Sequence, residues 1–169
     1  MNTKHLSSAI TLIEILVVIV ILGILAAYVA PNISGWNCRQ EIRNDFSKIN
    51  GFLQLTRSEA VTRNKTMMAH YNRNGYFRAY QTSKSCQINT SIVSTDIPDL
   101  VINKKNIIPR GSDKFRTCFN ADGSSYGGQF IISRQCGSQD NKFRAQIFSA
   151  TGFIERSKFN FKKNAWEEM

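Results

Sequence analysis

Hydrophobic residues are concentrated in one long run near the start of the chain. From Ala9 to Pro31 the sequence is almost entirely apolar, and one carboxylate, Glu14, interrupts it. No charged residue occurs from Ile15 to Cys38, and a helix of that length reaches roughly 36 Å, enough to cross a hydrocarbon core of about 30 Å. A removable secretory signal has a shorter apolar core followed by a small-residue cleavage site. We therefore expect this segment to remain on the protein as a membrane anchor.

The next stretch has the pattern of an amphipathic helix. Apolar and small residues recur at steps of four and three, so they line one helix face: Ile42, Phe46, Ile49, Leu53, Thr56 and Ala60. Charged residues occupy the other faces. We predict one long helix from about Ile10 to Asn64, whose second half packs under a globular head. Gly23 and Pro31, with Gly35, are the expected points of kinking.

After Asn64 the pattern becomes that of short β-strands. Two β-prone runs, 66–71 and 76–81, flank the turn signal Asn72-Arg73-Asn74-Gly75. Residues 82–98 are rich in Ser and Thr, and we expect mostly loop there. Further strands are predicted at 100–103, 115–119, 129–133, 143–149 and 153–159, with Thr151-Gly152 as the turn of a C-terminal hairpin. The predicted fold class is α+β, a helix packed on antiparallel sheet.

Composition limits the possible partners of the head. The chain has 169 residues and a net charge of +10, and the part after the anchor is long enough for a single small domain with its own core. Its basic surface can meet nucleic acid, anionic lipid or an acidic protein. It can also be only a solvated surface.

The four cysteines indicate an oxidising compartment. They are Cys38, Cys86, Cys118 and Cys136, and four cysteines allow three complete connectivities. We favour a disulfide between Cys118 and Cys136, which closes the loop between two predicted strands, with Cys38 unpaired and Cys86 unassigned. Buried free thiols are the alternative. Since no Cys-x-x-Cys is present and no histidine accompanies a cysteine pair, we expect neither a metal nor a cofactor.

Enzyme chemistry finds no support in the sequence. The chain lacks Gly-x-Ser-x-Gly, a phosphate-binding loop and His-Glu-x-x-His, and its carboxylates form no evident catalytic pair. His70 lies in a predicted strand, and His5 precedes the apolar run. We therefore expect a protein without catalytic activity.

The N-terminal segment resembles that of type IV pilins and type II secretion pseudopilins. The resemblance rests on Thr11-Leu12-Ile13-Glu14, the long aliphatic run, Gly23 and Pro31. It implies that a prepilin peptidase cuts between Ala9 and Ile10 and N-methylates Ile10. The family usually has glycine before the cut and Phe or Met after it, whereas this chain has Ala9 and Ile10.

The resemblance also implies a division of the chain and a mode of assembly. Residues 1–9 form a leader, 10–34 a transmembrane and assembly helix, and 35–169 a periplasmic head. The weakly positive leader places the head outside the inner membrane, which the chain crosses once. Glu14 of one subunit then pairs with the N-terminal amine of a neighbour. The implied partners are other pilins or pseudopilins, the prepilin peptidase and the inner-membrane assembly platform.

The end of the long helix narrows the resemblance to a subgroup. Residues 53–64, Leu-Gln-Leu-Thr-Arg-Ser-Glu-Ala-Val-Thr-Arg-Asn, look like the first-helix end of H-type pseudopilins and FimT-type minor pilins. This implies a type IV pilin-like fold with two small sheets. It also implies a role near the tip of a type II secretion pseudopilus or a type IV pilus. A membrane-anchored periplasmic domain that never polymerises is an alternative.

DNA is a second candidate partner. Some FimT-type minor pilins bind DNA during natural transformation through a Gly-Arg-x-Arg sequence near the C-terminus. Here that stretch reads Gly152-Phe153-Ile154-Glu155-Arg156, so the motif is broken. Basic and aromatic residues nevertheless interleave in the last third of the chain, which suits contact with a nucleic-acid backbone. The alternative is that the aromatic residues are the core-facing positions of strands. The candidate contacts are Arg144, Arg156, Lys158, Lys162 and Lys163.

Overall fold

The structure consists of two compact units that we describe separately. The computed structural model describes residues 11–72, 75–82, 86, 93–94, 96–103 and 115–169, and for residues 28–33 and 93–94 the backbone alone. The first unit is Met1–Asn37 and the second, the head, is Cys38–Met169. The predicted cleavage residues Ala9 and Ile10 lie outside the described residues.

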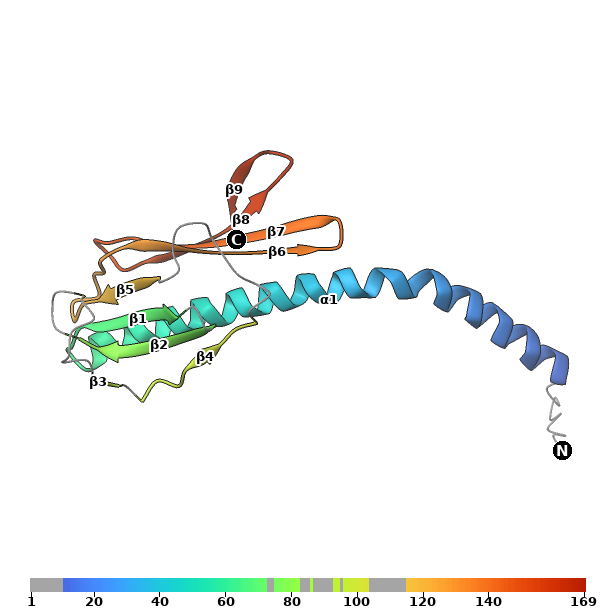
Figure 1. Ribbon diagram of the computed structural model, residues 1–169, viewed down its shortest axis with the longest axis horizontal. Helices are drawn as coiled ribbons and strands as arrows, with labels where there is room; N and C mark the ends of the chain where they lie inside the picture. Colours follow the sequence, from blue (N-terminus) through green and yellow to red (C-terminus); the bar gives the residue numbers. More distant parts are fainter. Residues whose placement is uncertain (1–10, 73–74, 83–85, 87–92, 95, 104–114) are drawn as a thin grey trace, which may run out of the picture. The chain divides into compact units, whose positions relative to one another are not determined.

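One helix, α1, runs from Leu12 to Thr62 (Figure 1). Its bounds lie within two residues of the predicted ones. The helix ends in a Schellman motif, because Asn64 adopts a left-handed conformation with φ of 51°. The Lys65 amide donates to the Ala60 carbonyl at 3.0 Å and the Asn64 amide to the Val61 carbonyl at 3.2 Å. Asparagine tolerates this conformation better than most residues, which explains the stop at this point.

The second part of α1 buries the face that its periodicity predicted. All six residues are at most 1% exposed: Ile42, Phe46, Ile49, Leu53, Thr56 and Ala60. The hydroxyl of Thr56 donates to the Phe52 carbonyl at 2.8 Å, so the one polar group in this row is satisfied within the helix. The predicted packing of the helix under the head is confirmed.

The first sheet of the head has five strands. They are β1 (Met67–Asn72), β2 (Tyr76–Gln81), β3 (Val93–Ser94), β4 (Leu100–Val101) and β5 (Arg116–Phe119). The order is β3-β2-β1-β5, and β4 pairs with the other end of the β2 edge. β1 and β2 form the predicted hairpin, in which Asn72 pairs with Tyr76 and Gly75 has φ of 88°. All pairings are antiparallel.

The second sheet has four antiparallel strands in sequence order. They are β6 (Gly128–Cys136), β7 (Gln139–Ile147), β8 (Ile154–Asn160) and β9 (Ala165–Glu168). β6 and β7 are longer than predicted, and β9 was not predicted because its sequence, Ala-Trp-Glu-Glu, contains no β-branched residue. Its Trp166 packs on Phe159 of β8 with ring centroids 5.2 Å apart, so tertiary contact overrides a weak local preference.

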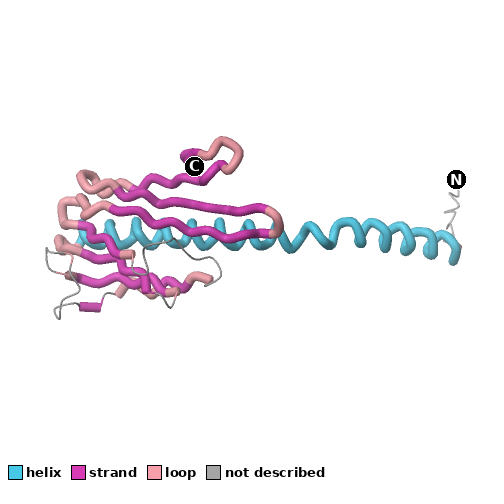
Figure 2. Tube along the Cα trace, turned by 45° about the horizontal axis from the view of Figure 1, so that its top comes forward, coloured by secondary structure: helices cyan, strands magenta, loops and turns pink. Residues whose placement is uncertain are grey.

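Both sheets pack on α1 and share one hydrophobic core. In Figure 2 the helix passes behind the strands of both sheets. Tyr71 and Phe77 of the first sheet and Phe115, the residue before β5, meet Phe130 of the second sheet at ring-centroid distances of 5.0 to 5.6 Å. Phe46 stacks on Phe143 of β7 at 5.3 Å. The two-sheet α+β head agrees with the expected fold class.

The predicted disulfide between Cys118 and Cys136 is wrong. Cys38 pairs with Cys136, and Cys86 pairs with Cys118, with Cα atoms 5.6 and 5.7 Å apart. Cys118 lies within the first sheet, whereas Cys136 ends β6, a nine-residue strand that carries it roughly 30 Å along the second sheet. Closeness in sequence therefore misled the prediction. Cys38 is not free, since it ties the beginning of the head to the end of β6.

Candidate assembly segment and basic face of the head

The beginning of α1 presents apolar side chains in every direction. The large apolar residues from Leu12 to Leu25 are all between 49% and 82% exposed. An amphipathic helix has one apolar stripe, whereas a helix that is apolar on all sides requires an apolar environment on all sides. The segment therefore lacks its surroundings when the chain stands alone, and a bundle of similar helices or a lipid phase can supply them.

Glu14 occupies the first turn of this segment. Thr11 caps the helix: the Glu14 amide donates to the Thr11 hydroxyl at 3.3 Å and to the Thr11 carbonyl at 3.0 Å. The spacing Thr-x-x-Glu is that of a capping box, and an acid in the first turn interacts favourably with the helix dipole. Its side chain is exposed. The carboxylate is thus positioned at the very start of the helix, where a neighbouring chain can reach it.

The other two residues expected to act in assembly are Gly23 and Pro31, and the structure describes the first fully and the second only in its backbone. Gly23 lies within α1, and a Cβ at this position would meet nothing within 4 Å. Pro31 lies in the helical backbone whose side chains are not described. None of the helical stretches that the structure describes combines the length and the apolarity that a membrane crossing requires.

Arg144, the first DNA-binding candidate, is engaged within the outer face of the second sheet. Its guanidinium lies over Trp166, 4.6 Å from the ring centroid. It also donates to the Ser157 hydroxyl at 3.3 Å and pairs with Glu155 at 3.6 Å. Its side chain is 21% exposed. Arg144 therefore stabilises the packing of β9 on the sheet, and little of it is available to a ligand.

Arg156 and Lys158 project from the opposite face of the same sheet. In the antiparallel register Arg156 lies opposite Ala145, and Lys158 lies opposite Phe143. Directly opposed residues point to the same side of a sheet, and Phe143 faces the helix, where it stacks on Phe46. Both basic side chains are exposed. They therefore lie beside the helix-facing core.

Lys162 and Lys163 lie in the turn between β8 and β9, which Asn160 organises. The side-chain oxygen of Asn160 accepts hydrogen bonds from both lysine amides, at 3.0 and 3.2 Å. The Lys163 ammonium pairs with Glu167 at 2.9 Å. This ammonium, together with the Asn160 amide, lowers the pKa of the Glu167 carboxyl. Lys163 is therefore neutralised locally, while Lys162 is exposed.

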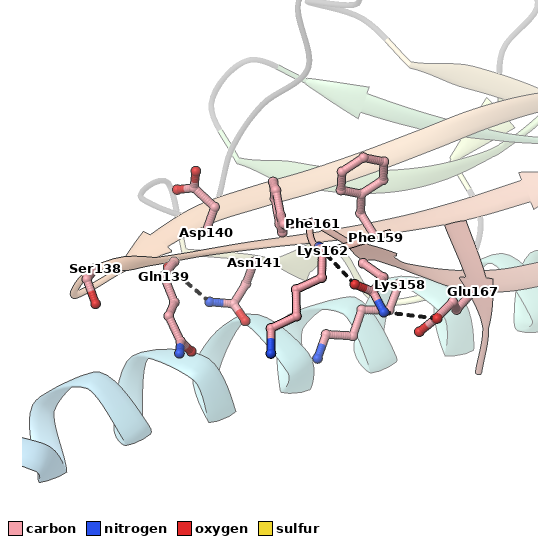
Figure 3. Close-up of a pocket in the computed structure, with 10 residues that line it drawn as sticks. Ser138, Gln139, Asp140, Asn141, Lys158, Phe159, Phe161, Lys162 and Glu167 are labelled. Atoms are coloured by element: carbon pink, nitrogen blue, oxygen red, sulfur yellow. Dashed lines mark hydrogen bonds between the residues drawn. The ribbon is translucent and has the colours of Figure 1, made fainter. Parts of the chain in front are cut away.

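Lys158 and Lys162 line one hollow, next to the turn between β6 and β7. The hollow has a volume of about 530 Å³, and its lining includes Gln139, Asn141 and Glu167. Figure 3 shows both lysine side chains directed from the sheet toward the helix, while Asp140 points the other way. The structure thus brings two of the five candidates together, places Arg156 on the same face, and separates Arg144 from them.

Two family models match the chain. The model described as "Prokaryotic N-terminal methylation motif" matches residues 4–30, and the model described as "Type II transport protein GspH" matches residues 47–152. The latter covers more than half of the chain. The chain belongs to the GspH family. No curated protein and no solved structure matches it.

Membership of the GspH family makes this protein a type IV pilin-like minor pilin or pseudopilin. The family is structural rather than enzymatic. Such proteins interact with other pilins and with the prepilin peptidase that processes the methylation motif. The GspH match ends at Gly152, so β8, β9 and four of the five DNA-binding candidates lie beyond it.

A junction at the far end of α1 has no counterpart among the residues predicted from the sequence. Arg57 donates from Nε to the Gly123 carbonyl at 3.2 Å and from Nη2 to the Thr151 carbonyl at 2.9 Å. It thereby joins the helix to the loop before β6 and to the turn before β8. The turn at Gly152 was predicted from the sequence. Its contact with α1 had no sequence signal.

Proposed function

We propose that this GspH-family protein is a prepilin that is cut between Ala9 and Ile10, N-methylated at Ile10 and assembled into a filament. Residues 10–34 form the transmembrane and assembly helix, so the chain crosses the inner membrane once, with the head in the periplasm. The filament is a type II secretion pseudopilus or a type IV pilus. Neighbouring pilins and the inner-membrane assembly platform are the partners.

The observation that carries this proposal is the apolar beginning of α1 with a carboxylate at its start. A helix exposed on all sides at 49% or more gains from burial about 25 cal/mol per Å² of apolar surface. Glu14 inside such a bundle needs a compensating charge, because an isolated buried carboxylate is costly. Cleavage creates that charge, the amine of Ile10. Pairing between Glu14 and the amine of the neighbouring subunit satisfies both groups.

The sequence supports storage in the membrane before assembly. The uncharged stretch from Ile15 to Cys38 is long enough, at roughly 36 Å, to cross a bilayer core of about 30 Å. Gly23 and Pro31 are proposed points where the helix bends when it passes from the bilayer into the filament.

Coexpression with a prepilin peptidase tests the processing step. The intact mass of the purified protein should fall by the leader, residues 1–9, and rise by one methyl group. Ala9→Gly should be cut at least as completely, and Ala9→Leu should remain uncut because the peptidase accepts a small residue there. A full-length mass for the unaltered chain would favour the third interpretation, a membrane-anchored domain that does not polymerise.

A position near the filament tip rests on the resemblance to the subgroup alone. Immunogold labelling of sheared filaments tests it. Label confined to one filament end supports the tip position, and label along the whole length excludes it.

DNA binding by the head is the second candidate function. The observation that favours it is that Arg156 and Lys158 are exposed on one face of β8, with Lys162 nearby. A mobility shift with detergent-solubilised protein, repeated across salt concentrations, tests it. Binding should weaken steeply with salt, and Arg156→Gln with Lys158→Gln should reduce it while Lys48→Gln should not. The absence of any shift at low salt would eliminate this function.

A further inference from the structure

The head begins at Cys38, and a disulfide bond fixes this end of the head to the second sheet. Cys38 is the first residue of the head unit and is joined to Cys136, the last residue of β6. The turn between β6 and β7 follows at once. Ser138 of this turn and Gln139, the first residue of β7, line the hollow that holds Lys158 and Lys162. We call this end the base of the head. It is the part of the head nearest along the chain to the proposed transmembrane segment.

Two arginines of α1 lie at the base on one flank of the helix. Arg39 precedes Arg57 by about five full turns, so both occupy the same helix stripe, and Arg57 contacts the turn that leads into β8. Arg43 follows Arg39 by one turn and is exposed. The flank that carries Arg39 and Arg43 therefore faces the side of the head on which β8 lies.

Glu41 on the other flank of the helix is already neutralised. It pairs with Arg134 of β6 at 2.6 Å and accepts a hydrogen bond from the Asn103 side chain. Asp45 pairs with Lys48 at 3.6 Å. The acidic groups of α1 near the base are thus occupied on the side away from β8, and among the described residues neither of them forms an ion pair with Arg39 or Arg43.

Lys158 and Lys162 complete the basic surface from the sheet. They point toward the helix from β8 and from the turn after it (Figure 3). Glu167 is the acid next to them, and its carboxylate is held by Lys163 at 2.9 Å and by the Asn160 amide at 2.9 Å. Neither Lys158 nor Lys162 forms an ion pair within the part of the chain that the structure describes. The surface formed by Arg39, Arg43, Lys158 and Lys162 therefore carries a net positive charge.

The geometry points to the anionic phospholipid headgroups of the membrane as the partner of this surface. The inference rests on the proposed function, namely insertion of the chain before assembly. The uncharged stretch ends at Cys38 and Arg39 is the next residue, so a helix that fills the hydrocarbon core with this stretch delivers Arg39 to the headgroup layer. Arg43 follows one turn later, about 6 Å away, within the Debye length of about 8 Å.

The expected consequence is a head held against the bilayer until the subunit is extracted. Each Lys or Arg close to an anionic surface strengthens the attraction about fivefold. Four such groups act only while the base touches lipid, since the attraction decays within a Debye length. Extraction of the subunit from the membrane moves these four groups away from the headgroups and therefore ends the attraction.

Lysine footprinting on the whole processed protein tests this inference. The protein is placed in nanodiscs of neutral phosphatidylcholine or of phosphatidylcholine with phosphatidylglycerol, acylated briefly with an N-hydroxysuccinimide ester, and digested for mass spectrometry. We expect acylation of Lys158 and Lys162 to be at least about fivefold slower in the anionic nanodiscs at low salt and to recover at high salt. Lys65, at the far end of α1, is the internal control and should react equally in both.

A matched variant separates lipid contact from indirect effects. Arg39→Gln with Arg43→Gln removes the two cations nearest the headgroups and should restore much of the acylation of Lys158. Lys48→Gln, on the other flank, should not. Equal acylation of Lys158 in neutral and anionic nanodiscs would overturn the inference, as would protection that persists at high salt.

The same sample distinguishes failure of the inference from failure of the proposed function. Resistance of the anchor segment to extraction at alkaline pH reports insertion independently of the footprint. An inserted chain with equal acylation rates refutes the lipid contact alone. A chain that is extracted refutes both insertion and the lipid contact.

Discussion

The carbonyl oxygen of Gly123 lies 2.2 Å from the point at which a Cβ atom on Gly152 would be placed. Gly152 also has φ of 62°, a conformation that favours glycine. The same carbonyl accepts the Arg57 hydrogen bond at 3.2 Å. Three segments that are distant in sequence, the end of α1, the loop before β6 and the turn before β8, therefore meet without room for one additional methyl group.

Gly152→Ala should destabilise the head by roughly 2–4 kcal/mol, because it adds both backbone strain and a clash with Gly123. Gly137→Ala is the matched control: φ is 66° there, and a Cβ would meet nothing within 4 Å. It should cost only about 1 kcal/mol. Guanidinium titrations of the detergent-solubilised protein measure both. Equal losses would show that the contact with Gly123 is unimportant.

Arg57→Lys should lower the free energy of unfolding by about 1–2 kcal/mol, since one ammonium cannot reproduce the guanidinium fork that reaches two carbonyls. Arg43→Lys, at an exposed position of the same helix, should change it by less than about 0.5 kcal/mol. The same titration serves for both variants. A loss that is no larger for Arg57 than for Arg43 would mean that the two carbonyl contacts contribute little.

Removing the disulfides should destabilise the head to different extents. The sequence separations are 98 for Cys38–Cys136 and 32 for Cys86–Cys118, which correspond to about 4.7 and about 3.7 kcal/mol in the chain-entropy treatment. Paired Cys→Ser variants measure the two losses. Non-reducing peptide mapping gives the connectivity, and a peptide joining Cys118 to Cys136 would contradict it.

Stability should fall in acid partly through Asp99. Arg78 donates from Nε to both Asp99 oxygens, at 2.9 and 2.8 Å, and this hydrogen bonding lowers the pKa of the Asp99 carboxyl. A carboxyl group whose pKa is lowered in the folded state stabilises that state at pH values above its pKa in the unfolded chain, about 3.9. This stabilisation is lost as the pH falls through the pKa of the folded state.

Arg78→Gln tests that assignment. The pair is partly exposed, so the variant should be only slightly less stable at pH 7. The difference from the parent should shrink below about pH 4. Parallel denaturant titrations between neutral pH and pH 3 measure it. A difference that is constant across this range would exclude Asp99 as the titrating group.

Glu14→Gln should leave membrane insertion intact but reduce incorporation into filaments more than about a hundredfold, because removing one member of a buried pair costs about 3–5 kcal/mol. Glu14→Asp keeps the charge and should retain part of the incorporation. Quantitative blotting of sheared filaments measures both. Normal incorporation of the Gln variant would rule out the proposed pairing between Glu14 and the amine of the neighbouring subunit.

Local pattern was sufficient for the helix and insufficient for the cross-links. The buried row from Ile42 to Ala60 follows from the helical period alone, and each of its members is buried. The partners of Cys38 and Cys118 depend on where long strands end, which no short-range pattern encodes. The contact of Arg57 with Gly123 joins residues 66 positions apart and was equally inaccessible to sequence reasoning.

The faces on which the candidate DNA-binding residues lie were also beyond the reach of local sequence pattern. Arg144 and Arg156 lie in the adjacent strands β7 and β8, yet β-strand alternation places them on opposite faces of the sheet. The register that pairs Ala145 with Arg156 decides this. A register shift of one residue would exchange the two faces, so the grouping of the basic residues required the structure.

The bond between Cys38 and Cys136 also determines how the head responds to mechanical load. Tension that enters the chain at Asn37 passes through sulfur directly into β6. The stretch between the two cysteines, which contains the rest of α1 and the whole first sheet, is a closed loop outside that load path. A subunit pulled by its N-terminal helix therefore transmits force to its second sheet without unravelling the first.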